Sequence, residues 1–300
     1  MASYVGLFNR GVLDERVEAA RARLISCTLC PRCCGVNRNE VPGTLCRTGA
    51  RPVVSAWHAH FGEEAPLVGR NGSGTIFFGS CSLGCVFCQN WTISRLLEGR
   101  EVTPEDLARV MIALERSGCH NINLVTPTHM VPHILGALRV AIPMGLTVPL
   151  VYNTGGYDSV ETLRLLDGVV DIYMPDIKFL DGHAASRYCA AEDYPAVVRA
   201  AVLEMHRQVG DLVADGQGVA TRGLLVRHLV MPGRVADTRQ VCRFLAQEVS
   251  RDTYLNLMDQ YRPCGMAAGY PEIARRITRQ EFDEALRAAG EEGLRRAGRS

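Results

Sequence analysis

Three cysteines in one short run are the residues of this sequence best suited to chemistry. Cys81, Cys85 and Cys88 follow the spacing C-x3-C-x2-C. Thiolates hold iron–sulfur clusters, usually one on each iron of a [4Fe–4S] cube. Three local thiolates therefore predict a cube with one iron left open, and an open metal position is where chemistry takes place. The alternative is a structural zinc loop, which needs a fourth ligand nearby, and no cysteine or histidine follows until residue 119.

A second group of cysteines lies closer to the N-terminus. Cys27, Cys30 and Cys34 are followed after eleven residues by Cys46, and Cys33 is a fifth cysteine in the same stretch. Four thiolates at such spacings are typical both of zinc sites and of [4Fe–4S] clusters. We predict that Cys27, Cys30, Cys34 and Cys46 hold a metal centre, either a second [4Fe–4S] cluster, which we prefer, or zinc.

The composition limits the possible classes of protein. The chain has 300 residues, of which 47% are hydrophobic, enough for one large α/β barrel or two smaller domains. Its net charge of +1 gives no electrostatic reason to expect a nucleic-acid partner. No apolar run of roughly 18 residues predicts a membrane span, and no secretion signal is recognisable at the N-terminus. We therefore expect a cytoplasmic protein whose twelve cysteines serve metal binding rather than disulfides.

Alternating strand and helix patterns must position the three-cysteine loop. A helix is predicted over residues 1–26, and six strand–helix pairs follow after residue 74, which implies a parallel sheet with right-handed crossovers. Thr103 and Asp106 form a capping-box pattern at the start of the first of these helices. The predicted strands are Thr75–Phe78, Asn121–Val125, Val148–Tyr152, Val169–Met174, Leu224–Val230 and Thr253–Met258. The cysteine loop comes directly after the first strand.

Polar side chains gather where the predicted strands end. The carboxyl ends of parallel strands are where barrels and open sheets carry their functional groups. Lys178 is the only lysine among 33 basic residues, which indicates either that an ammonium group is needed at its position or that one lysine has survived there by chance. The polar residues at the strand ends are Thr126, Thr128, Asn153, Thr154, Asp176, Lys178, Arg227, His228 and Asn256.

The cysteine run and several longer stretches resemble the radical S-adenosylmethionine (radical SAM) superfamily, and within it the pyruvate formate-lyase activating-enzyme-like iron–sulfur proteins. The resemblance extends from Cys27 to about Ile277. It implies an α/β fold with a partial (β/α)6 barrel, so we predict an N-terminal helix and metal-binding segment over residues 1–60 and the barrel over 61–300. The stretches that carry it are Cys30–Arg38, Gly72–Phe78, Cys88–Asn90, Asn123–His129, Val151–Tyr157, Asp171–Lys178, Val226–Gly233 and Leu255–Tyr261.

The resemblance also implies an activity. In the superfamily, SAM chelates the open iron of the cluster. An electron from the reduced cluster then cleaves SAM to methionine and a 5′-deoxyadenosyl radical, and this radical abstracts hydrogen from a substrate. The implied electron donor is a reduced flavodoxin or ferredoxin. One segment departs from the family pattern, because Thr126-Pro127-Thr128 stands where many members have Gly-Gly-Glu. By resemblance, Cys81, Cys85 and Cys88 ligate the cluster, and SAM contacts come from Asn153, Thr154, Asp176, Lys178 and Arg227.

The substrate remains open at this stage. We expect an unidentified small molecule or peptide. One alternative is an activating enzyme for a glycyl-radical protein, whose partner would be a polypeptide backbone. Another is a non-catalytic iron–sulfur protein on the same scaffold.

Overall fold

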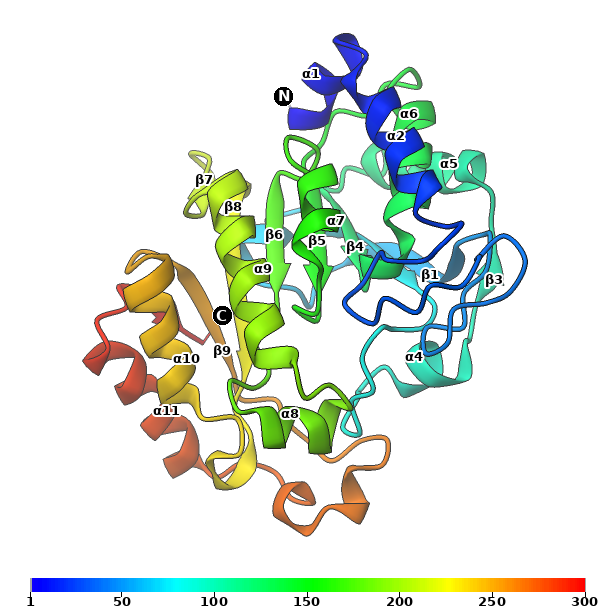
Figure 1. The fold of residues 1–300 in the computed structure, drawn as a ribbon. Helices are drawn as coiled ribbons and strands as arrows, with labels where there is room; N and C mark the ends of the chain where they lie inside the picture. The colour runs from blue at the N-terminus through cyan, green and yellow to red at the C-terminus, as the bar shows by residue number, and fades with distance from the viewer. Residues whose placement is uncertain (1, 300) are drawn as a thin grey trace.

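One open sheet runs through the computed structural model, which describes residues 2–299 (Figure 1). Within these residues the order of neighbouring strands is β10-β9-β8-β6-β5-β4-β2-β1-β3, and β7 pairs with β8. The strands are β1 (Val53–His60), β2 (Ser73–Phe78), β3 (Arg100–Glu101), β4 (Ile122–Val125), β5 (Leu150–Thr154), β6 (Ile172–Pro175), β7 (Val213–Ala214), β8 (Ala220–Leu229), β9 (Tyr254–Met258) and β10 (Arg296–Gly298).

The six predicted strands lie in the parallel part of this sheet, which also includes β10. They correspond to β2, β4, β5, β6, β8 and β9, each parallel to its neighbour in that order. This confirms the α/β fold with a parallel sheet. The strand β1 was not predicted, and it pairs antiparallel with β2. The sheet therefore begins at Val53, inside the segment that the sequence analysis assigned to the N-terminal part.

The helices lie between the strands, much as the sequence predicted. The helix α5 begins at the predicted capping box, where Thr103 Oγ1 accepts a hydrogen bond of 3.1 Å from the Asp106 N–H. The predicted N-terminal helix is two helices, because the chain turns at Gly11 with φ of 74°. The helices are α1 (Ser3–Asn9), α2 (Val12–Ala22), α3 (Ala65–Val68), α4 (Trp91–Leu96), α5 (Pro104–Arg116), α6 (Val131–Ala141), α7 (Val160–Leu165), α8 (Gly182–Cys189), α9 (Tyr194–Val209), α10 (Thr238–Phe244) and α11 (Arg279–Glu291).

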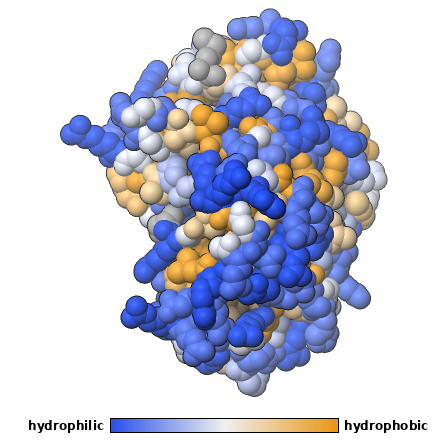
Figure 2. Space-filling view, turned by 90° about the vertical axis from the view of Figure 1, so that its left-hand side faces the viewer, coloured by the Kyte–Doolittle hydropathy of each residue, from blue (hydrophilic) through white to orange (hydrophobic). Residues whose placement is uncertain are grey.

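Helices cover the sheet and close its core. In Figure 1, α5 and α6 lie beside each other with α2 nearby, α9 lies across β6 and β8, and α10 lies against α11. Figure 2 shows a mostly hydrophilic face on which hydrophobic side chains form small separate patches. Among the helices of residues 2–299, none combines the length and the apolar character needed to cross a bilayer.

Two arginines fasten the cysteine-rich N-terminal segment to the rest of the protein. Arg38 is only 1% exposed and donates from Nη1 to the His129 carbonyl at 2.7 Å and from Nε to the Thr48 carbonyl at 3.1 Å. Arg32 Nε donates to the Ser82 carbonyl of the three-cysteine loop at 3.1 Å. The segment consequently packs against the end of the sheet where the polar strand-end residues lie.

Candidate cofactor site

The three clustered cysteines line one cavity together with the strand-end residues. The cavity has a volume of about 250 Å³ and lies at the carboxyl ends of β2, β4, β5, β6 and β8. Its wall includes all of the residues that the sequence predicted for the cluster and for SAM: Cys81, Cys85, Cys88, Asn153, Thr154, Asp176, Lys178 and Arg227. The structure thus brings two separately predicted sets of residues to the same place.

Backbone contacts hold the three-cysteine loop against α8. The Gly84 N–H donates to the Cys189 carbonyl at 2.9 Å, and the Val86 N–H donates to the Tyr188 carbonyl at 2.9 Å. A Cβ atom at Gly84 would lie 2.9 Å from Ala190 Cβ, closer than such atoms normally approach. Glycine at this position is therefore what allows the loop and α8 to pack closely.

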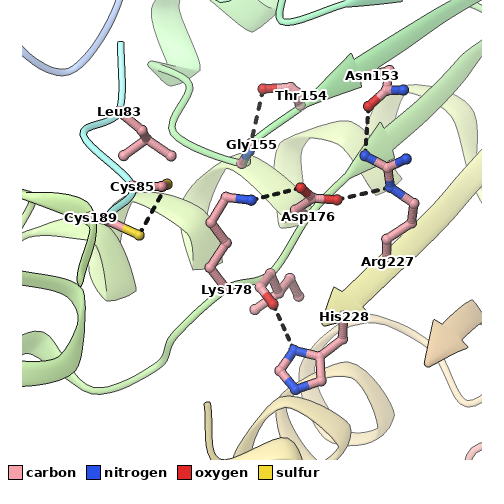
Figure 3. Close-up of polar contacts among 12 residues, drawn as sticks. Leu83, Cys85, Asn153, Thr154, Gly155, Asp176, Lys178, Cys189, Arg227 and His228 are labelled. Atoms are coloured by element: carbon pink, nitrogen blue, oxygen red, sulfur yellow. Dashed lines mark hydrogen bonds and ion pairs between the residues drawn. The ribbon is translucent and has the colours of Figure 1, made fainter. Parts of the chain in front are cut away.

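A fourth cysteine, Cys189 at the end of α8, lies beside the loop. Its Sγ is 3.3 Å from Cys85 Sγ, and this contact lowers the pKa of Cys85 to about 7 (Figure 3). Burial instead raises the pKa of Cys81 to about 12. Cys189 carries no recognisable signal in the sequence, because it is 104 residues from Cys85 and its own neighbours form no metal-binding pattern.

The charged strand-end side chains form one connected network (Figure 3). Lys178 Nζ donates to Asp176 Oδ2 at 2.7 Å, and Arg227 Nε donates to the other oxygen, Asp176 Oδ1, at 2.8 Å. Arg227 Nη2 also donates to Asn153 Oδ1 at 2.8 Å. Asp176, Lys178 and Arg227 each keep 17% of their side-chain surface exposed, which leaves them accessible from the cavity.

These contacts keep the network ionised. Burial alone would raise the pKa of Asp176, but the positive charges of Arg227 and Lys178 hold it below its ordinary value. Burial alone would lower the pKa of Lys178, but the carboxylate of Asp176 holds it well above its ordinary value. The cavity therefore offers a permanent ammonium, guanidinium and carboxylate, which suits a ligand that carries both signs of charge.

Two threonines near the cavity bind a buried carboxylate with their hydroxyls, and a third lines the cavity in an unusual backbone conformation. The hydroxyls of Thr154 and Thr128 donate to the buried Asp158 at 2.6 and 2.7 Å. They are committed to that carboxylate, although Thr154 still lines the cavity through its other atoms. Thr126 also lines the cavity and has φ of 60°, a conformation that β-branched residues rarely adopt. Of the unusual Thr-Pro-Thr segment, Thr126 is therefore the residue that faces the cavity.

The donor set fits an iron–sulfur cluster better than a single ion. Throughout residues 2–299, no three His, Cys, Asp or Glu side chains are grouped so that they could hold one metal ion. A [4Fe–4S] cube places its ligands on separate irons, so its thiolates do not meet at one point. Three thiols on one wall of a cavity of about 250 Å³ match that requirement.

The N-terminal cysteines have much less space. Cys27, Cys30, Cys34 and Cys46 line one cavity of only about 10 Å³. Burial raises the pKa of Cys30 to about 12, and Cys33 is exposed. The four predicted ligands line this small cavity together. The metal that we predicted at this place stays a prediction.

Two glutamates close to this site carried no recognisable signal in the sequence. Glu63 and Glu64 lie in the loop after β1, and both come within 4 Å of Arg227. They lie outside any periodic segment and more than 160 residues before Arg227 in the sequence, so a local pattern could not reveal their proximity to it.

Comparisons with known proteins agree with this geometry. The family model described as the radical SAM superfamily matches residues 75–211, a range that contains the three-cysteine loop and most of the strand-end network. Two uncharacterised proteins of Methanocaldococcus jannaschii are similar along most of the chain. MJ0674 is 33% identical over 288 residues, which covers 93% of this chain and 78% of that protein. MJ0808 is 26% identical over 258 residues, which covers 77% of this chain and 69% of that protein.

Solved structures share the fold. A radical SAM methyltransferase from Sphaerobacter thermophilus superposes with a TM-score of 0.52 at 14% identity, over 76% of this chain and 66% of that chain. At this identity the likeness concerns the fold alone. Taken with the family model and the cysteine loop, it completes a consistent assignment: the chain belongs to the radical SAM superfamily.

Proposed function

We propose that this protein is a radical SAM enzyme that abstracts hydrogen from a small molecule or a peptide. The observation that carries the proposal is the shared cavity, since three thiols and a network of permanent charges line the same wall. A [4Fe–4S] cluster and SAM are the cofactors that membership of the family implies.

The residues of the cavity have distinct parts in this proposal. Cys81, Cys85 and Cys88 hold the cluster, which supplies the electron for reductive cleavage of SAM when both are bound. Lys178 and Arg227 bind the carboxylate of SAM, because they are the ammonium and guanidinium groups that line the cavity among the described residues. Asp176 keeps both cations oriented through its two carboxylate oxygens.

Two side chains complete the SAM pocket in this proposal. The Asn153 side chain is fixed by Arg227 and leaves its amide nitrogen for hydroxyl or carbonyl acceptors. Thr126 offers its backbone carbonyl where many family members use Gly-Gly-Glu. Apolar neighbours, including Leu83 and Phe87, exclude water from the reacting atoms.

The electron would come from a reduced flavodoxin or ferredoxin, and the substrate would occupy the space beyond Arg227. A second cavity of about 450 Å³ begins there and shares Asn153 and Arg227 with the first. It is large enough for a small metabolite or for one side chain of a peptide.

A direct test measures 5′-deoxyadenosine. The chain is reconstituted with iron and sulfide without oxygen, reduced with dithionite and given SAM. We expect 5′-deoxyadenosine from the wild type and only background from Cys85→Ala. A wild-type protein that binds about four irons per chain yet makes no more 5′-deoxyadenosine than Cys85→Ala would instead support a non-catalytic iron–sulfur protein.

A further inference from the structure

We propose that Glu63 and Glu64 form the binding site for a positively charged group of the substrate, a primary amine or a guanidinium. This inference rests on the proposed function, since it names the class of substrate for that cavity. It concerns the second cavity, of about 450 Å³, in which Glu63 and Glu64 lie together with Asn256, Asp259 and Arg299.

The second cavity is continuous with the cofactor cavity. Both are lined by Phe77, Val125, Asn153, Arg227 and Met258. The three cysteines line only the first cavity, and the two glutamates line only the second. A molecule held by the glutamates would therefore lie on the far side of Arg227 from the thiols, next to SAM rather than in its place.

The Glu64 carboxylate is held in position but is not satisfied. Its side chain is 5% exposed, and Oε1 accepts a hydrogen bond of 3.0 Å from Asn256 Nδ2 across the gap between the β1 loop and β9. The other oxygen, Oε2, is buried without a hydrogen-bond donor among the described residues. Because a buried carboxylate oxygen without a donor is costly, such an arrangement favours a ligand that supplies one.

The cation in contact with the pair is already engaged elsewhere. Within the described part of the chain, Arg227 is the cation in contact with both glutamates, at 3.7 Å from Glu63 Oε2 and 3.8 Å from Glu64 Oε1. Its short bonds, each 2.8 Å, go to Asp176 and Asn153. The connected network thus holds three carboxylates (Glu63, Glu64 and Asp176) against two cations (Arg227 and Lys178).

Other charges of the second cavity do not correct this imbalance. Asp259 forms an ion pair of 3.3 Å with Arg299, so the charges of these two side chains cancel. Burial and the neighbouring His58 lower the pKa of His60, which is therefore neutral near pH 7. Burial also raises the pKa of Glu63 to about 7, so this carboxyl retains a proton for part of the time in the free protein. An organic cation would replace that proton and restore neutrality.

The test uses model cations with the reconstituted holoenzyme and SAM, measured by anaerobic calorimetry. The probes are N-acetyl-lysine methylamide and N-acetyl-arginine methylamide for a peptide source, and cadaverine for a small-molecule source. The matched neutral compound is N-acetyl-norleucine methylamide. We expect at least one cationic probe to bind the wild type roughly tenfold or more tightly than the neutral compound. The probe that binds best indicates the source of the cation.

Variants assign the binding to the glutamates. Glu63→Gln and Glu64→Gln keep the size of the side chains, and the double variant removes both charges. We expect the double variant to lose roughly tenfold or more of its affinity for the cationic probe while its affinity for SAM is unchanged. The control is Asp259→Asn, which removes a carboxylate of the same cavity that already has a cation partner, and it should retain affinity within about twofold.

Three results would overturn the inference. The first is equal binding of the cationic and neutral probes to the wild type. The second is an unchanged affinity in the double variant. The third is a loss of SAM affinity in that variant, which would place the glutamates at SAM instead. None of these readouts requires turnover, so they are independent of the 5′-deoxyadenosine test of the proposed function.

Discussion

The two groups of cysteines differ in what surrounds them. Cys81, Cys85 and Cys88 face a cavity of about 250 Å³ at the ends of parallel strands, where Asp176, Lys178 and Arg227 supply charges. The N-terminal group lies in turns around a cavity of about 10 Å³. Both groups have spacings that suit a metal. The difference teaches that similar cysteine spacings can have very different surroundings: of these two groups, the one at the strand ends combines a larger cavity with charges of both signs.

The largest expected effect is the loss of a thiol at the strand ends, compared with the loss of a thiol from the N-terminal group. We expect Cys88→Ala to lower the rate of 5′-deoxyadenosine formation by roughly a hundredfold or more, because the cluster loses a ligand. We expect Cys34→Ala to lower it by less than about threefold. The two rates are compared with equal amounts of folded protein, checked by circular dichroism. Equal losses in the two variants would remove the distinction between the groups.

Iron content sharpens the same comparison. In the triple variant Cys81→Ala, Cys85→Ala, Cys88→Ala, we expect anaerobically reconstituted protein to lose about four irons per chain, because the cluster at the strand ends loses its three thiolate ligands. Iron and zinc are measured together by plasma emission spectrometry. About four remaining irons would show that the N-terminal segment holds a second cluster.

The charges at the strand ends are the next feature to test. Lys178→Met keeps the length of the side chain but removes its charge, and we expect SAM to bind roughly tenfold more weakly, as calorimetry without reductant can measure. Lys178→Arg tests whether an ammonium is specifically needed, since guanidinium differs in size and geometry. If Lys178→Met binds SAM as the wild type does, Arg227 alone holds the carboxylate.

The smallest effects concern the two glycines beside the cysteines. Gly84→Ala would bring its Cβ to 2.9 Å from Ala190, so we expect a loss of about 1–3 kcal/mol in the free energy of unfolding. A Cβ atom at Gly35 would meet no other atom within 4 Å, but the backbone there has φ of 68°, which is strained for alanine. We therefore expect Gly35→Ala to lower the free energy of unfolding by about 1 kcal/mol. Urea denaturation of the apo proteins measures both. A larger loss at Gly35 would mean that the N-terminal segment is the more tightly packed of the two.

Sequence reasoning predicted the parts of this molecule that depend on local pattern. The capping box at Thr103 identified the start of α5, and the pattern of apolar residues located the six predicted strands. The strand-end residues were found because parallel strands bring their carboxyl ends to one edge. Their joint position on one cavity wall followed from that rule.

The remaining features depend on contacts between distant parts of the chain. The strand β1 mixes two histidines and a tryptophan with small residues, so its weak alternation did not identify an antiparallel partner for β2. Cys189 meets Cys85 across 104 residues, and Glu64 meets Asn256 across 192. Tertiary packing brings these residues together, and no periodic pattern of nearby residues in the sequence predicts such contacts.

Arg38 has a consequence for the charge of the N-terminal cysteines. Its guanidinium is almost completely buried and donates to three backbone carbonyls, those of Thr48, Gly49 and His129. No carboxylate of residues 2–299 lies within ion-pair distance of it. Burial raises the pKa of Cys27, whereas the charge of Arg38 acts in the opposite direction. The segment is thus folded around a buried positive charge that favours the thiolate form of Cys27.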